Sequence, residues 1–217
     1  MNQTPQPPSD QMPGVPAGGP YPVRFDVVYP DRQLNRVSSA FRIFAAIPII
    51  AVLVAIGGGD WGRFGAAAGG VVFVPALLMI LFRQKYPRWW FDWNRELLRF
   101  SNRVGAYLAL LSDGYPSTDE QQYVTLELDF PDVTRDLNRW LPLVKWLLAL
   151  PHYVVLLFLY LASVLAVIAA WFSILFTGRY PRGLFDFVVG VMRWQNRVFG
   201  YAFVLTTDRY PPFRLAP

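Results

Sequence analysis

Hydrophobic and polar residues alternate in two short segments of the chain, residues 23–29 and 124–130. In each, apolar side chains recur at every second position, which is typical of a half-buried β-strand. Pro30 and Pro131 end the two segments, because proline cannot continue a strand ladder. We expect the strands to pair with each other or with the C-terminal tail at a membrane surface. The alternative is an extended peptide that lies along the lipid headgroups.

Long apolar runs follow each predicted strand. In the first half, residues 43–56 and 71–82 are separated by a glycine-rich stretch that contains Asp60 and Arg63. With the small residues beside it, each run approaches the ~20 residues of a membrane-spanning helix. In the second half, residues 140–176 are apolar almost throughout, which is too long for one straight span of a ~30 Å hydrocarbon core. This run predicts either a tight hairpin or one kinked helix with an interfacial beginning.

Basic residues flank these runs on both sides and favour the hairpin. Because positive charge marks the cytoplasmic side, both ends of each run are predicted to be cytoplasmic, which requires an even number of crossings. We therefore expect four spans in two hairpins with cytoplasmic N- and C-termini, and three spans as the alternative. The flanking basic residues are Arg32, Arg36, Arg42, Arg83, Lys85 and Arg88 in the first half, and Arg135, Arg139, Arg179 and Arg182 in the second.

A segment of mixed character follows each apolar run. Residues 184–205 place Asp186, Arg193, Asn196 and Arg197 along one helical stripe, and Arg99, Asn102 and Arg103 form the matching stripe in the first half. An arginine at the bilayer centre costs about 2.5 kcal/mol or more. We therefore expect two amphipathic helices that lie in the membrane interface, at the depth that tryptophan prefers.

These parallels extend to an internal repeat. We predict a mainly α-helical membrane protein of two tandem repeats, 21–116 and 117–217, after a disordered Pro/Gly-rich cytoplasmic tail at 1–20. Each repeat comprises a short strand, a transmembrane helical hairpin and an amphipathic interfacial helix. Matching positions in the second part of each unit are Phe82, Tyr86, Pro87, Arg88, Phe91, Asp92, Arg99, Asn102, Arg103, Val104 and Tyr107 with Phe176, Tyr180, Pro181, Arg182, Phe185, Asp186, Arg193, Asn196, Arg197, Val198 and Tyr201.

Three segments carry a resemblance to a known family. They are RWLPLVKWLLALPHY from Arg139, LFTGRYPRGLFDFVVGVMRWQNRV from Leu175 and TDRYPPF from Thr207. The chain resembles the bacterial membrane family catalogued as domain of unknown function 4389, more closely in its second repeat. The first repeat has Arg-Gln-Lys where the pattern has Thr-Gly-Arg. The resemblance implies an integral membrane protein and supplies no catalytic residue.

Composition agrees with a membrane protein. Of 217 residues, 54% are hydrophobic and only 16% charged, against about 25% charged in soluble domains. The net charge is +5, which we interpret as membrane-side charge and not as a nucleic-acid-binding surface. The chain contains no cysteine and one histidine, which excludes a disulfide scaffold, a thiol nucleophile and a multi-histidine metal centre.

The candidate functional residues concern lipids and helix packing. Gly65 and Gly69 form a small-residue motif that lets another helix approach closely. His152 lacks acidic neighbours in sequence and is interpreted as a local structural residue. We identify no catalytic residue, metal ligand or cofactor site. The arginines predicted to bind lipid headgroups are Arg88, Arg99, Arg103, Arg179, Arg182, Arg193 and Arg197.

The expected function follows from these features. We expect a non-enzymatic, multi-pass protein of the cell membrane that acts as a scaffold or organises anionic lipids on the cytoplasmic side. A membrane protein partner or a homodimer is possible. The alternative is a small transporter or channel, which would need polar groups at mid-membrane depth.

Overall fold

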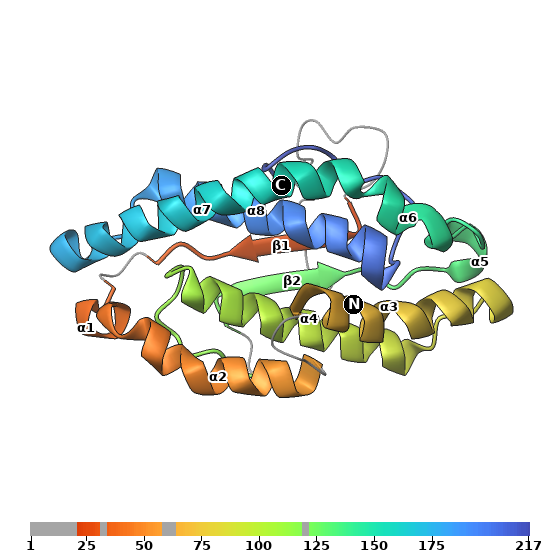
Figure 1. Cartoon of the computed structure of the whole chain (residues 1–217), viewed down its shortest axis with the longest axis horizontal. Helices are drawn as coiled ribbons and strands as arrows, with labels where there is room; N and C mark the ends of the chain where they lie inside the picture. Colours follow the sequence, from red (N-terminus) through yellow and green to blue (C-terminus); the bar gives the residue numbers. More distant parts are fainter. Residues whose placement is uncertain (1–20, 31–33, 58–63, 119–121) are drawn as a thin grey trace, which may run out of the picture.

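The computed structural model describes residues 21–30, 34–57, 64–118 and 122–217, with the backbone alone at 56–57 and 64–72. The predicted disordered tail, Asp60 and Arg63 lie outside these residues. The described chain is mostly helical, as expected, with one small sheet (Figure 1).

The sheet consists of β1 (Val23–Val27) and β2 (Val124–Leu128), which pair antiparallel. The register centres on Phe25 opposite Leu126. Buried and exposed side chains alternate along both strands, so the prediction that the two strands pair with each other is confirmed. The alternative of an unpaired extended peptide is wrong.

Two amphipathic helices cover the inner face of the sheet. They are α4 (Arg88–Leu108) and α8 (Arg182–Phe199), and a π-helical turn, η1 (Gly200–Val204), continues α8. Contacts cross between the halves of the chain, because α4 packs against β2 and α8 against β1. Phe25, Leu126, Phe91 and Phe185 meet in the core between sheet and helices.

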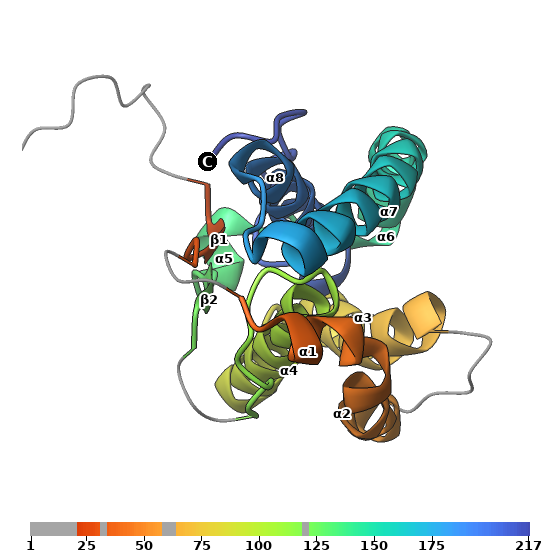
Figure 2. The same ribbon diagram turned by 90° about the vertical axis from the view of Figure 1, so that its left-hand side faces the viewer.

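A second layer of helices lies on the far side of α4 and α8 from the sheet (Figure 2). Its elements are α1 (Arg36–Ala40), α2 (Arg42–Gly57), α3 (Phe64–Arg83), α6 (Pro142–Leu148) and α7 (Leu150–Thr177), and a short α5 (Val133–Asp136) follows β2.

The hairpin expected at residues 140–176 is a wrong prediction. The short α6 is followed by a single helix of 28 residues, α7, which agrees with the alternative of one helix with a separate beginning. Pro151 lies in the first turn of α7, where the missing N–H has no partner in any helix. The helix ends only at Gly178, which adopts a left-handed conformation (φ 74°).

The corresponding run in the first half does not fold back either. At its beginning, the Ser39 carbonyl accepts a hydrogen bond from Trp171 near the end of α7 (3.1 Å). At its end, the Leu81 carbonyl accepts one from Arg139, just before α6. The described helices α2 and α3 therefore both run along the long axis of the molecule in the direction opposite to α7 (Figure 1). Among the described helices, α7 alone is long and apolar enough to span a membrane by itself.

Candidate functional site

Large apolar side chains are exposed along α2, α3 and α7. Phe158 of α7 is 66% exposed and Phe44 of α2 is 69% exposed. Monomeric soluble proteins rarely expose apolar patches of more than a few hundred Å². We call this surface the apolar face, and define it by Ile43, Phe44, Ile47, Val52, Val74, Leu78, Phe82, Val154, Leu157, Phe158, Leu161, Val164, Leu165, Ile168, Phe172 and Phe176.

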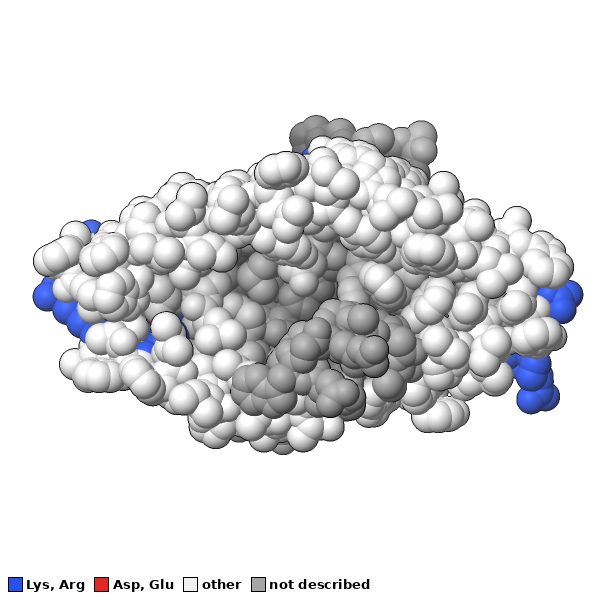
Figure 3. All heavy atoms as spheres, in the orientation of Figure 1, with Lys and Arg blue, Asp and Glu red and all other residues white. Residues whose placement is uncertain are grey.

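Among the residues that the structure describes, charge is nearly absent from this side of the molecule. The space-filling view shows no Asp or Glu on it, and Lys and Arg only at its two ends (Figure 3). The opposite side carries the sheet (Figure 2), whose outward side chains are charged except for Thr125. Arg24 there pairs with Glu127 (3.1 Å) and Asp129 (2.8 Å), and Asp26 is also exposed. The molecule is therefore amphipathic from one broad side to the other.

The polar stripes of α4 and α8 lie inside the fold. Asn102 and Asn196 are buried and hydrogen-bond to each other. Arg103 and Arg197 are also buried, and their guanidinium groups donate to backbone carbonyls of Ser117 and Ala216, respectively. We call Asn102, Arg103, Asn196 and Arg197 the polar seam.

Two further arginines of the polar stripes form hydrogen bonds to the backbone of the sheet. Arg99 donates from Nε to the Leu126 carbonyl (2.9 Å), and Arg193 donates from Nε to the Phe25 carbonyl (3.0 Å). These are the two central residues of the strand register. Arg99, Arg103, Arg193 and Arg197 thus have protein partners, and we do not propose them further as headgroup ligands.

The other predicted headgroup ligands lie at the ends of the molecule. The Arg88 guanidinium stacks over the Phe130 ring (5.1 Å) and that of Arg182 over the Tyr29 ring (4.6 Å), while Arg179 is exposed. Headgroup binding by these three stays a prediction. Gly65 and Gly69 lie in α3, but their packing is outside the described side chains.

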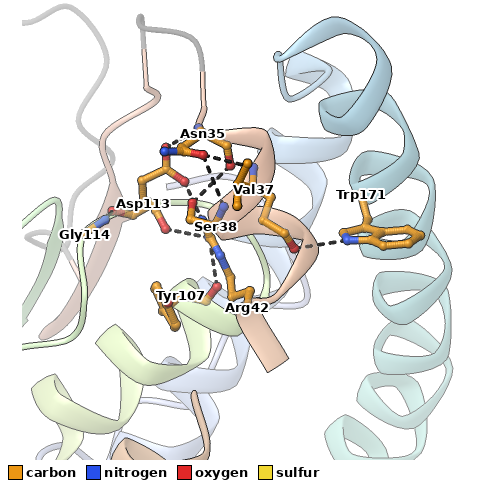
Figure 4. A network of polar contacts seen from close by, with 10 residues as sticks. Asn35, Val37, Ser38, Arg42, Tyr107, Asp113, Gly114 and Trp171 are labelled. Carbon is orange, nitrogen blue, oxygen red and sulfur yellow. Dashed lines mark hydrogen bonds and ion pairs between the residues drawn. The ribbon is translucent and has the colours of Figure 1, made fainter. Parts of the chain in front are cut away.

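Two buried cations occupy matching positions at the starts of the helical runs. Arg42 forms an ion pair with Asp113 and donates to the carbonyls of Tyr107 and Ser112 (Figure 4). Lys145 pairs with Asp208 (2.6 Å). Both cations lie near an aromatic ring, Arg42 at 4.6 Å from that of Tyr107 and Lys145 at 5.2 Å from that of Tyr201.

The acidic partners of Arg42 and Lys145 were not predicted from the sequence. Each aspartate lies two residues before the closing Tyr-Pro of its half, Tyr115-Pro116 or Tyr210-Pro211, which is the signal that could have identified it. Each also accepts a backbone N–H, that of Asn35 at Asp113 and that of Asn138 at Asp208. The aspartates therefore tie the helical runs to the ends of α4 and η1.

Little in the described part of the chain suggests metal or acid–base chemistry. No group of three or more His, Asp or Glu side chains there could hold a metal ion. His152 is fully buried and accepts a hydrogen bond from Trp194 (3.0 Å). It stacks on Phe213, so its surroundings are aromatic.

Comparison with known proteins gives one match. Residues 140–214 match the family described as domain of unknown function (DUF4389), whereas no curated protein and no solved structure matches the chain. The matched segment contains α6, α7, α8 and η1, and so one buried cation, the longest apolar helix and half of the polar seam. Over residues 140–214 the chain is therefore similar to DUF4389, in agreement with the resemblance in its sequence.

Proposed function

We propose that the protein is a membrane-surface protein whose apolar face is embedded in one leaflet, with the sheet exposed to the aqueous phase. The observation that carries this proposal is the separation of exposed apolar and exposed charged side chains onto opposite sides of the molecule. The exposed Lys and Arg at both ends of the apolar face fit the headgroup region. Since basic residues mark the cytoplasmic side, the cytoplasmic leaflet is the one proposed.

An orientation with the long axis of the molecule perpendicular to the membrane fits the charged side chains of the sheet less well. At about 1.5 Å per residue, α7 is about 42 Å long, more than the ~30 Å of a hydrocarbon core. The sheet lies midway along the long axis (Figure 1), so upright insertion would place Asp26 and Glu127 at mid-bilayer depth. A charge there costs about 2.5 kcal/mol or more by insertion scales. Lying flat avoids this cost.

The internal contacts support a duplicated architecture. Residues matched in sequence meet their counterparts, as Asn102 does with Asn196, or make the same contact, as Arg99 and Arg193 do on the two strands. We propose that the two halves arose by duplication and exchange strands, since β1 packs on α8 and β2 on α4.

For the activity, we propose a non-enzymatic scaffold or lipid-organising subunit. A transporter or channel would need polar groups free to contact a substrate. Here Asn102 and Asn196 satisfy each other, and Arg103 and Arg197 donate to backbone carbonyls. Hydrogen bonds of this kind support a structural role for the polar seam.

Single cysteines test the orientation, because the chain has none of its own. Gln84→Cys and Arg179→Cys place thiols just after α3 and α7, at opposite ends of the long axis. Asp26→Cys reports the sheet side and Phe158→Cys the apolar face. In membranes, a membrane-impermeant maleimide should label positions 26, 84 and 179 from the same side and should leave position 158 unlabelled.

Two results would contradict the proposal. Labelling of positions 84 and 179 from opposite sides would show that the molecule crosses the bilayer, as the three-span alternative requires. Labelling of position 158 in membranes as readily as position 26 would show that the apolar face is not embedded. Labelling of all four positions in detergent-free unfolded protein serves as the reactivity control.

A further inference from the structure

An open groove of about 710 Å³ lies where α3 ends and the chain turns into α4. Its walls come from Met79 and residues 83–87 on one side and residues 130–134 on the other. Phe82 of the apolar face and Trp89 flank this turn, and both are 70% exposed. The groove is thus next to the boundary between the apolar face and the aqueous surface.

Two cations in the groove lack an acidic partner. Arg83 and Lys85 are exposed, and neither forms an ion pair with another residue that the structure describes. Asp132, the acidic residue in the opposite wall, already accepts hydrogen bonds from the Thr134 backbone N–H (3.0 Å) and hydroxyl (2.7 Å). These bonds lower the pKa of Asp132, which therefore stays ionised while it caps α5.

The aromatic floor of the groove is fixed in place. The Tyr86 hydroxyl donates to the Val204 carbonyl (2.9 Å), and the rings of Tyr86, Phe91 and Phe130 contact one another. Arg88 stacks over Phe130 and adds a third positive charge beside the groove. A rigid wall with cations on one side suits a ligand that has one anionic group and an apolar extension.

We propose that this groove binds the phosphodiester headgroup of an anionic glycerophospholipid, with Arg83 and Lys85 on the phosphate and the acyl chains along Phe82 on the apolar face. This inference rests on the proposed membrane-surface location, and it specifies the class of lipid that the protein binds there. The volume is within the range of small-molecule sites and exceeds what a free phosphate ion needs. Arginine binds phosphate oxygens through its planar fork and lysine as a point charge.

The test uses the full chain in detergent micelles and counts bound lipids by native mass spectrometry. Dioctanoyl phosphatidylglycerol is titrated against dioctanoyl phosphatidylcholine and against sn-glycerol 3-phosphate. The double variant Arg83→Gln/Lys85→Gln removes both cations. One basic residue near an anionic lipid changes affinity by about fivefold, so the double variant should bind phosphatidylglycerol about 25-fold more weakly.

A matched control removes the same charge elsewhere. Arg24→Gln/Arg95→Gln changes two cations that already have acidic partners, so phosphatidylglycerol binding should change by less than threefold. An equal loss in both double variants, or no loss in the groove variant, would overturn the proposal. Binding of glycerol phosphate as tightly as the lipid would overturn the lipid assignment in favour of soluble phosphate esters.

The outcome is separable from that of the membrane proposal. The cysteine labelling at positions 26 and 158 does not depend on Arg83 or Lys85, because these two positions report the sheet and the apolar face. Protected Phe158→Cys together with unchanged lipid selectivity in the groove variant would leave the membrane location supported and remove the headgroup site.

Discussion

Asn102 of α4 and Asn196 of α8 donate to each other, each from Nδ2 to the Oδ1 of its partner, at 2.8 and 2.7 Å. Each amide also donates to the carbonyl four residues earlier in its own helix, that of Leu98 or Met192. Both side chains are buried. The pair therefore fixes the position of α4 relative to α8 at this point.

Breaking this pair should destabilise the fold. Asn102→Leu leaves the Asn196 carbonyl oxygen buried without a donor, so the free energy of unfolding should fall by about 1–3 kcal/mol. Asn102→Leu/Asn196→Leu should cost less than the sum of the single variants, because no unsatisfied amide remains. Chemical unfolding in micelles measures both, with Ser101→Ala as a neighbouring control. Strictly additive losses would show that the two amides are not coupled.

The strands and the amphipathic helices could be predicted from local pattern. Alternation located β1 and β2, and the matched Arg and Asn positions located α4 and α8. Whether the polar stripes of α4 and α8 are buried in the protein or face the membrane interface could not be predicted from one helix alone. An arginine such as Arg197 can reach a headgroup or a backbone carbonyl, and only the packing of α8 against β1 and the C-terminal residues decides between them.

The prediction of two transmembrane hairpins failed for a different reason. Hydropathy measures which residues avoid water, and the positive-inside pattern assumes that each apolar run crosses the bilayer. Here apolar side chains such as Phe44 and Phe158 share one broad side of the molecule, and the cations lie at both ends of it. The same sequence pattern arises whether helices lie along a membrane surface or cross it.

The two buried cations should respond differently to pH. Burial lowers the pKa of the Lys145 ammonium, and Asp208 opposes that shift. Asp208→Asn therefore lowers the pKa of Lys145 further and should cost about 3–5 kcal/mol at pH 7, because it leaves a buried charge unpaired. As pH rises toward the unfolded-state pKa near 10.5, the folded state loses its proton first. The free energy of unfolding should then rise with pH more steeply than in the wild type.

Asp113→Asn provides the matched control. This variant should be destabilised to a similar degree at pH 7. No alkaline recovery is expected, because a guanidinium group, unlike an ammonium group, is not deprotonated in proteins. Burial raises the pKa of Tyr201, next to Lys145. Denaturant unfolding between pH 7 and pH 10 distinguishes the two variants. Parallel pH profiles would show that Lys145 does not titrate earlier in the folded state.

The turn after α3 contains a residue in a strained backbone conformation, and a substitution by glycine should relieve the strain. Gln84 adopts a left-handed conformation (φ 47°), whereas the matching residue after α7 is Gly178 (φ 74°). Since glycine reaches this region without steric cost, Gln84→Gly should raise the free energy of unfolding by about 0.5–1 kcal/mol. Gly178→Ala should lower it by about as much or more. Thermal unfolding compares them, and equal effects of the same sign would contradict this explanation.

Arg193 should not be replaceable by lysine. Its guanidinium makes three bonds in different directions, to the Phe25 carbonyl (3.0 Å), the Leu215 carbonyl (2.9 Å) and the Asp26 carboxylate (2.9 Å). A lysine ammonium lacks the planar fork and cannot reach all three, so Arg193→Lys should lose about 1–3 kcal/mol. Arg95→Lys, on a more exposed part of α4, should stay within about 0.5 kcal/mol of the wild type. If Arg193→Lys unfolds with the wild-type midpoint, the fork is not needed, and Arg193 would have to be considered again as a residue that faces lipid.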